Sequence, residues 1–232
     1  VFSQQPKVSS KYHFGGRLVQ QADGHLFITL GDRGSRREDV QPLSTHVGKV
    51  VHITATGEAA ATNPFTAQAD AKKEVWSYGH RNIQGATLDS AGRLWTHEHG
   101  PQGGDEINVV KKGANYGWPV ITYGIDYDGT IISDQTQKEG MEQPLYYWVP
   151  SIAPSGMTFV EGDRYPTWKG HLLVGSLKFE YLELVKLDGE KVIGRQKVAD
   201  GIGRLRDVKQ GPDGYIYMAV EGKGIIKIVP KG

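Results

Sequence analysis

Several basic residues of this 232-residue sequence have the type and spacing to bind an anionic ligand. Arg204 and Arg206 are separated by one residue in a segment that alternates as a β-strand does, so both guanidinium groups should point the same way. Guanidinium groups bind planar carboxylates through paired hydrogen bonds, and several converging cations suit a polyanionic ligand. The alternative is a set of solvated surface arginines, which is our interpretation of Arg33, Arg36 and Arg37. The basic residues assigned to the candidate site are Arg17, Arg81, Lys178, Arg204 and Arg206.

The segment of residues 97–106 offers two different kinds of metal site. In a strand His97 and His99 would share one face, but no third ligand follows with the helical spacing of a zinc protease. Oxygen ligands fit better, because the turn at Gly100 and Pro101 has free carbonyls and the acidic pair that ends the segment supplies carboxylates. Two carbonyls alone would bind calcium weakly, so a bound carboxylated cofactor would complete the coordination. The sequence favours calcium and leaves zinc as the minor alternative.

His13 and Asp32 form a candidate general base. His13 precedes a predicted strand, and Asp32 ends the next one, so a hairpin can bring the two side chains together. A carboxylate bonded to one imidazole nitrogen orients the other nitrogen to accept a proton. A single histidine is more often structural or exposed, and the residues alone leave that interpretation open.

The elements that must position these residues are β-strands in a repeated pattern. Four segments begin with a glycine and continue as a short apolar strand: residues 24–30 (GHLFITL), 92–98 (GRLWTHE), 170–176 (GHLLVGS) and 214–220 (GYIYMAV). Glycine provides the positive φ that tight hairpin turns require. Repeats of roughly 40 to 50 residues, each a small antiparallel sheet, are typical of propeller blades, and longer spacings indicate loop insertions. An ordinary β-sandwich with similar hairpins is the alternative.

The repeat also predicts where the working face lies. Eight residues after each glycine, at the end of the equivalent strand, come Asp32, Gly100, Lys178 and Gly222. In a propeller, equivalent strand ends gather on one face, where loops on a rigid scaffold carry function.

Composition supports an all-β fold class and excludes several functions. The 31 glycines and 11 prolines interrupt short β-rich runs, and the best helix candidate, residues 64–73, is interpreted as an Ala-rich loop insertion. The absence of cysteine excludes disulfides and thiolate metal sites. A net charge of +1 argues against nucleic acid as a partner, and no apolar run approaches the roughly 20 residues that membrane insertion needs. Residues 1–5 show no signal peptide.

Taken together, the motifs resemble those of the bacterial soluble quinoprotein glucose and aldose sugar dehydrogenases. The resemblance covers essentially the whole chain, with the motifs in family order. They are HFGGRLV (residues 13–19), GD (31–32), WSYGHRNIQG (76–85), EHGPQGGDEIN (98–108), GANYGWP (113–119), SLK (176–178), RLRDV (204–208) and GPDG (211–214).

The resemblance implies a six-bladed β-propeller that binds pyrroloquinoline quinone (PQQ) and calcium and oxidises the C1 hydroxyl of aldoses to lactones. It implies that His13 is the general base, that Asp32 orients it, and that Arg81 lies where negative charge develops on the quinone. The other implied cofactor-binding residues are Asn82, Lys178, Arg204 and Arg206. The implied calcium ligands are the carbonyls of Gly100 and Pro101 and, for a second, structural calcium, Glu106, the Tyr116 carbonyl and Asp126.

The resemblance begins about one third of the way into the family pattern. We therefore expect residues 1–232 to form one partial propeller domain, an incomplete ring of about four to five blades that lacks the N-terminal blade or blades. The implied partners are aldose sugars and an electron acceptor, which could be a quinone, a cytochrome or a dye. The implied location is periplasmic or secreted.

Two other functions compete with this one. A calcium-dependent propeller lactonase would gather side-chain carboxylates on one metal and would have no use for the basic cluster. A non-catalytic extracellular binding propeller would be expected to lose His13 or that cluster.

Overall fold

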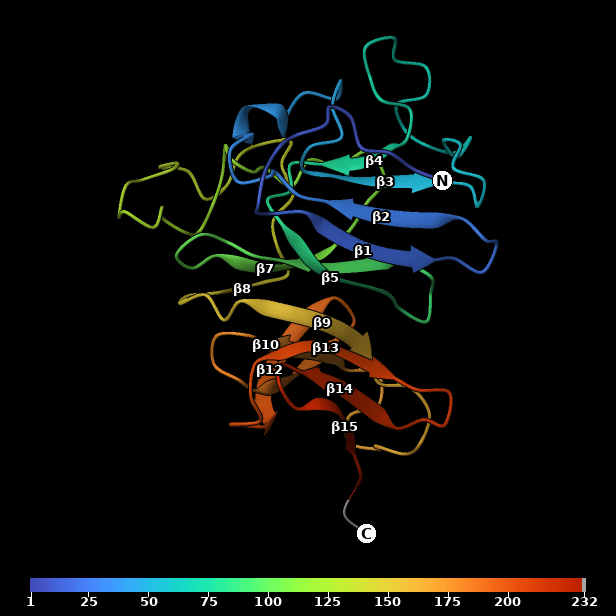
Figure 1. Ribbon diagram of the computed structural model, residues 1–232, viewed down its shortest axis with the longest axis vertical. Helices are drawn as coiled ribbons and strands as arrows, with labels where there is room; N and C mark the ends of the chain where they lie inside the picture. Colours follow the sequence, from blue (N-terminus) through green and yellow to red (C-terminus); the bar gives the residue numbers. More distant parts are fainter. Residues whose placement is uncertain (231–232) are drawn as a thin grey trace. The chain divides into compact units, whose positions relative to one another are not determined.

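The computed structural model describes residues 1–230 and confirms the all-β fold class (Figure 1). Apart from the short 3-10 helix η1 (Arg37–Asp39), every regular element in these residues is a strand. Residues 64–73 form turns and no helix, as expected for a loop insertion. No helix among the described residues is long and apolar enough to cross a membrane. The chain divides into two compact units, Val1–Val149 and Pro150–Gly232, which are described separately.

The first unit is built from two four-stranded antiparallel sheets. One has the order β1-β2-β3-β4 and consists of β1 (Gly15–Gln20), β2 (Leu26–Leu30), β3 (Lys49–Ile53) and β4 (Val75–Tyr78). The other has the order β5-β6-β7-β8 and consists of β5 (Ile83–Leu88), β6 (Leu94–Glu98), β7 (Asp105–Val109) and β8 (Tyr146–Trp148). Consecutive strands pair with each other in both sheets, which is the arrangement of a propeller blade.

The second unit contains one four-stranded and one three-stranded sheet. The four-stranded sheet has the order β12-β11-β10-β9 and consists of β9 (Pro154–Phe159), β10 (Leu172–Ser176), β11 (Leu182–Asp188) and β12 (Lys191–Ala199). The three-stranded sheet consists of β13 (Leu205–Gln210), β14 (Ile216–Val220) and β15 (Gly224–Ile228). These meanders bear out the propeller class. The number of blades and the single domain over residues 1–232 stay predictions.

The glycine-led repeat forms the second strand of every sheet. The strands β2, β6, β10 and β14 each begin two residues after their glycine. The glycines have positive φ angles, which are 87° at Gly24, 76° at Gly92, 78° at Gly170 and 76° at Gly214. A Cβ atom is disfavoured at such angles, so glycine permits the turn that starts each second strand.

Two buried apolar clusters anchor the segments of the first unit that carry the candidate site. The larger cluster joins both sheets to the loop after β7, and its buried members are Phe27, Val50, Ile83, Leu94, Val110 and Tyr116. The smaller cluster joins the loop after β2 to that same long loop, through Val40, Val47 and Trp118. Because these loops are packed into the core, their polar side chains are held in defined positions.

Candidate functional site

His13 and Asp32 lie side by side at the end of the β1–β2 hairpin. His13 Nδ1 is 2.6 Å from Asp32 Oδ1. The buried Asp32 carboxylate also accepts hydrogen bonds from the Gly34 N–H at 2.7 Å and from Trp118 Nε1–H at 2.8 Å. Burial alone would raise the pKa of Asp32, but the hydrogen bond and charge of His13, with the Gly34 bond and the charge of Arg81, outweigh it and lower that pKa. Asp32 is therefore ionised at neutral pH.

This pairing prepares His13 to accept a proton. An ionised carboxylate only accepts hydrogen bonds, so Nδ1 of His13 carries a hydrogen and, in the neutral ring, Nε2 holds a lone pair. The His13 side chain is 20% exposed and lines a cleft of about 730 Å³. His13 also has φ of 50°, an uncommon value for a non-glycine residue. The arrangement is that of a general base facing a cleft.

The cleft carries more charge than the sequence interpretation assigned to it. Arg33 and Arg37, which the sequence interpretation placed on the solvated surface, line it together with His13 and Arg81. Arg37 Nη2 donates to Asp126 Oδ2 at 2.8 Å. This bond is the largest of several causes that lower the pKa of Asp126. Loop residues distant in sequence thus surround the base with cations.

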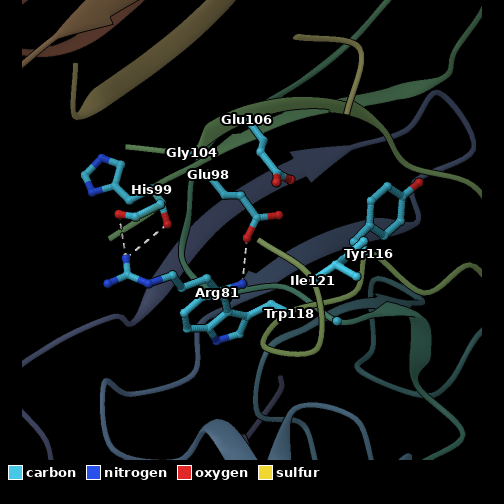
Figure 2. Close-up of a pocket in the computed structure, with 10 residues that line it drawn as sticks. Arg81, Glu98, His99, Gly104, Glu106, Tyr116, Trp118 and Ile121 are labelled. Carbon is cyan, nitrogen blue, oxygen red and sulfur yellow. Dashed lines mark hydrogen bonds between the residues drawn. The ribbon is translucent and has the colours of Figure 1, made fainter. Parts of the chain in front are cut away.

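Arg81 is buried and lines both this cleft and a much smaller cavity (Figure 2). Its Nη1 donates to the carbonyls of His99 at 3.0 Å and Gly100 at 2.9 Å. Its guanidinium carbon lies 5.3 Å from the centre of the Trp118 ring. Asn82, the next residue, is also buried, and its Oδ1 accepts the Gly15 N–H at 3.2 Å. The two equivalent strand ends of this unit, at Asp32 and Gly100, therefore both meet Arg81.

The smaller cavity, of about 10 Å³, brings two carboxylates together. Glu98 and Glu106 line it with Tyr116, and Figure 2 shows their carboxylates directed toward one another. Burial and then the negative charge of Glu98 raise the pKa of Glu106 to about 8. A cavity of this size holds about one water-sized sphere. Glu106 is therefore mostly protonated at neutral pH, and a cation in this cavity would favour its ionised form.

The remaining predicted metal ligands lie nearby on the loops. Gly100 and Pro101 begin a tight turn, since a Cβ on Gly100 would overlap the carbonyl groups of Gly103 and Gly104. Asp126 lies in the larger cleft, bonded to Arg37, and its role as a ligand stays a prediction.

A metal site formed by side chains alone is not present in residues 1–230. No group of three or more His, Cys, Asp or Glu side chains in that range is placed to bind one ion. His97 lies in β6 and is fully buried. A site near residues 97–106 would therefore depend on backbone carbonyls, which are typical of calcium and not of zinc.

The basic residues of the second unit form a separate group. Arg204, just before β13, and Arg206, within it, direct their guanidinium groups to the same carboxylate: Arg204 Nε and Arg206 Nη2 donate to Glu221 Oε2 at 3.1 and 2.6 Å. These two bonds, with that from Arg204 the larger cause, lower the pKa of Glu221. Arg204 Nη1 also donates at 3.3 Å to the carbonyl of Leu177, which precedes the exposed Lys178. The two arginine side chains are 47% and 51% exposed.

Sequence reasoning missed three contributors to the site. Trp118 holds Asp32 through its indole N–H, and His80 and Glu98 bond to each other beneath Arg81. All three lie inside the motifs of residues 76–85, 98–108 and 113–119. Their presence in those motifs was the available signal, but only the contacts show what each one does.

The fold and the site define a β-propeller protein with a histidine–carboxylate pair and a basic, carbonyl-rich face. A family model described as Glucose / Sorbosone dehydrogenase matches residues 1–227, and the chain belongs to this family. The chain is 44% identical to "Aldose sugar dehydrogenase YliI" of Escherichia coli (strain K12) over 237 residues, which cover 100% of this chain and 64% of that protein. This chain thus spans just under two thirds of that relative's length.

Solved structures give the same relationship. A crystal structure of a glucose dehydrogenase matches with a TM-score of 0.95 and 42% identity, covering 99% of this chain and 68% of that one. The PQQ-bound form of aldose sugar dehydrogenase from Streptomyces coelicolor matches with a TM-score of 0.72 and 30% identity, covering 96% of this chain and 60% of that one.

Proposed function

We propose that this protein is an aldose sugar dehydrogenase that uses PQQ and calcium to oxidise the C1 hydroxyl of aldoses to lactones. The observation that carries the proposal is the His13–Asp32 pair, which faces the same cleft as Arg81. Family membership and the PQQ-bound relative support the cofactor.

In this mechanism His13 removes the proton of the sugar C1 hydroxyl. Its Nε2 accepts that proton while hydride leaves C1, so the carbon loses two electrons and one proton goes to the ring. Asp32 stabilises the resulting imidazolium and keeps the His13 ring in one orientation. The Asp32 carboxylate is itself held in place by hydrogen bonds from Gly34 and Trp118. PQQ with calcium, when bound, would supply the acceptor for the hydride.

The basic residues suit a ligand bearing carboxylates. Arg204 and Arg206 already bind a carboxylate oxygen, that of Glu221, which is the chemistry that PQQ carboxylates would require. Lys178, Arg81 and Asn82 complete the proposed set. Arg81 would oppose negative charge that develops at the quinone oxygen.

Calcium fits the donor atoms of the first unit. The Gly100 carbonyl accepts one hydrogen bond, from Arg81 Nη1, and has a second lone pair. We assign it with the Pro101 carbonyl to the calcium that accompanies PQQ. Glu106, with the Tyr116 carbonyl and Asp126, is assigned to a second, structural calcium. Burial and then the charge of Glu98 raise the pKa of Glu106, and a bound cation would favour its ionised form.

The test is reconstitution of the native protein with PQQ and calcium, followed by dye reduction across several aldoses. Sugar-dependent dye reduction that needs both additions is the expected result. PQQ-independent lactone hydrolysis would indicate a lactonase, and sugar binding without dye reduction would indicate a binding propeller; either result contradicts the proposal. The physiological acceptor is proposed to be a quinone or cytochrome, and the location to be the periplasm or the exterior.

A further inference from the structure

Three buried residues, Ser77, His80 and Glu98, form a hydrogen-bonded series next to the Arg81 backbone, and the proposed reaction does not use them. Ser77 Oγ lies 2.9 Å from His80 Nε2, and His80 Nδ1 lies 3.0 Å from Glu98 Oε1. Ser77 is the next-to-last residue of β4, and Glu98 is the last residue of β6. Ser77 and His80 are fully buried, and Glu98 is 4% exposed.

The order serine, histidine, carboxylate is that of a hydrolase triad, but burial gives it another role. A nucleophile must reach a substrate, and the Ser77 hydroxyl is inaccessible. Both His80 ring nitrogens are engaged, Nδ1 with the Glu98 carboxylate and Nε2 with the Ser77 hydroxyl. The series therefore fixes the Glu98 carboxylate in one position. The His80 ring also stacks on Tyr116, with ring centres 4.6 Å apart.

The other oxygen of Glu98 holds the backbone of Arg81. Glu98 Oε2 accepts the Arg81 N–H at 2.6 Å, as the dashed line between Glu98 and Arg81 in Figure 2 shows. On the other side of the same residue, the Arg81 carbonyl accepts the Asp32 N–H at 2.8 Å. Arg81 is thus held from both sides, by Glu98 at its nitrogen and by Asp32 at its oxygen. The bonds run without a break from Ser77 to His13.

We propose that Glu98, held by His80, is a positioning residue that orients Arg81 and, through the Arg81 backbone, the Asp32–His13 pair. For the catalytic consequence this proposal rests on the proposed function, but the structural link does not. A carboxylate bonded to a backbone N–H is among the stronger hydrogen bonds in proteins. Loss of this bond frees the segment that carries the guanidinium, and small displacements of reacting groups are costly to rate.

The experiment compares Glu98→Ala and Glu98→Gln with a matched control, Asn63→Ala, in the native protein. Asn63 is also 4% exposed, also lies in the first unit, and also bonds to a buried histidine, His52, and to backbone carbonyls. It has no contact with Arg81 among the described hydrogen bonds. The readouts are kcat, the sugar KM, the thermal unfolding midpoint, and the low-field NMR signal of the His13 Nδ1 proton, assigned by its loss in His13→Asn.

Glu98→Ala is expected to lower kcat by roughly 100-fold, with KM changed little, and to shift or broaden the His13 signal. Glu98→Gln keeps an oxygen acceptor for the Arg81 N–H. Its side-chain NH2 can donate to His80 Nδ1 if the His80 ring carries its hydrogen on Nε2 instead. It should therefore lose only about fivefold in kcat, since a neutral acceptor bonds about half as strongly. Asn63→Ala should lower the unfolding midpoint and leave both kcat and the His13 signal unchanged.

Two results would overturn the proposal. One is a wild-type His13 signal and wild-type kcat in Glu98→Ala or, if that variant does not fold, in Glu98→Gln. The other is an equal change in the Asn63→Ala control, which would mean general destabilisation. If no variant or wild type reduces dye but the His13 signal still depends on Glu98, the proposed function fails and the positioning role stands.

Discussion

The two units of the molecule hold their candidate site residues in contrasting ways. In the first unit Asp32 and Arg81 are buried, and each makes several hydrogen bonds to backbone or aromatic groups. In the second unit Arg204 and Arg206 are half exposed and share the single carboxylate of Glu221. Exposed ion pairs contribute little to stability and exchange partners easily, whereas buried networks fix geometry.

This difference suits the two units to different tasks, the orientation of a catalytic group and the binding of an anionic cofactor. A general base must be held within a fraction of an ångström of its working position, and the first unit provides that rigidity. The proposed capture of an anionic cofactor needs positive charge that can exchange one carboxylate for another, which half-exposed ion pairs permit. Changes at His13 or Asp32 should therefore affect turnover, and changes at Lys178 or Arg206 should affect cofactor affinity.

Removal of calcium should have the largest effect. Chelation of the reconstituted protein should reduce sugar-dependent dye reduction to background, and calcium should restore it while zinc should not, because carbonyl and carboxylate oxygens dominate the proposed sites. Dye reduction is measured after dialysis against each metal. Recovery with zinc alone would favour the histidines His97 and His99 and would contradict the calcium assignment.

His13→Ala should lower kcat by about a hundred- to ten-thousandfold, the usual contribution of general-base catalysis, with PQQ affinity nearly unchanged. Steady-state kinetics at saturating PQQ measures the first quantity, and absorbance titration measures the second. The control is His25→Ala, which removes a histidine paired with Asp23 at 3.0 Å outside the cleft. Turnover within a few-fold of wild type in His13→Ala would remove His13 from the mechanism.

Arg206→Ala and Lys178→Ala should weaken PQQ binding and leave kcat at saturating PQQ almost unchanged. Loss of one charged partner costs about 2 kcal/mol at the lower end of the usual range, which suits half-exposed side chains. That corresponds to a dissociation constant about 30-fold higher. Arg195→Ala, which breaks another arginine–carboxylate pair of the second unit, with Glu183 at 3.2 Å, is the control and should bind PQQ normally. Wild-type affinity in both test variants would contradict the cofactor site.

The smallest of these effects should be that of Asp32→Asn on the stability of the fold, a loss that depends on pH. Folding lowers the pKa of Asp32 below its ordinary value of 3.8, so the ionised carboxylate stabilises the fold above that pH. The contribution disappears as the pH falls through the lower folded-state value. Urea unfolding should show Asp32→Asn less stable than wild type by about 1–2 kcal/mol at pH 7, with a smaller difference near pH 3. A difference that grows toward acid pH would contradict this account.

Much of the fold and part of the site followed from local sequence. The glycine-led repeat specifies four hairpin turns, because positive φ and an apolar strand are properties of adjacent residues. The placement of His13 beside Asp32 followed for the same reason, since one hairpin joins them. The shared direction of Arg204 and Arg206 needs only the alternation of a strand.

Other features depended on tertiary packing. Trp118 bonds to Asp32 across 86 positions of sequence, and Arg37 reaches Asp126 across 89, because the long loop after β7 packs against the loop after β2. No local pattern encodes such a contact, and so Arg37 could not be told from a solvated arginine. The same holds for Glu98, whose two oxygens meet His80 and Arg81 only when β6 lies beside β5. The sequence by itself determined the strands and the residue types available for chemistry, and the packing of distant loops decided which of them meet.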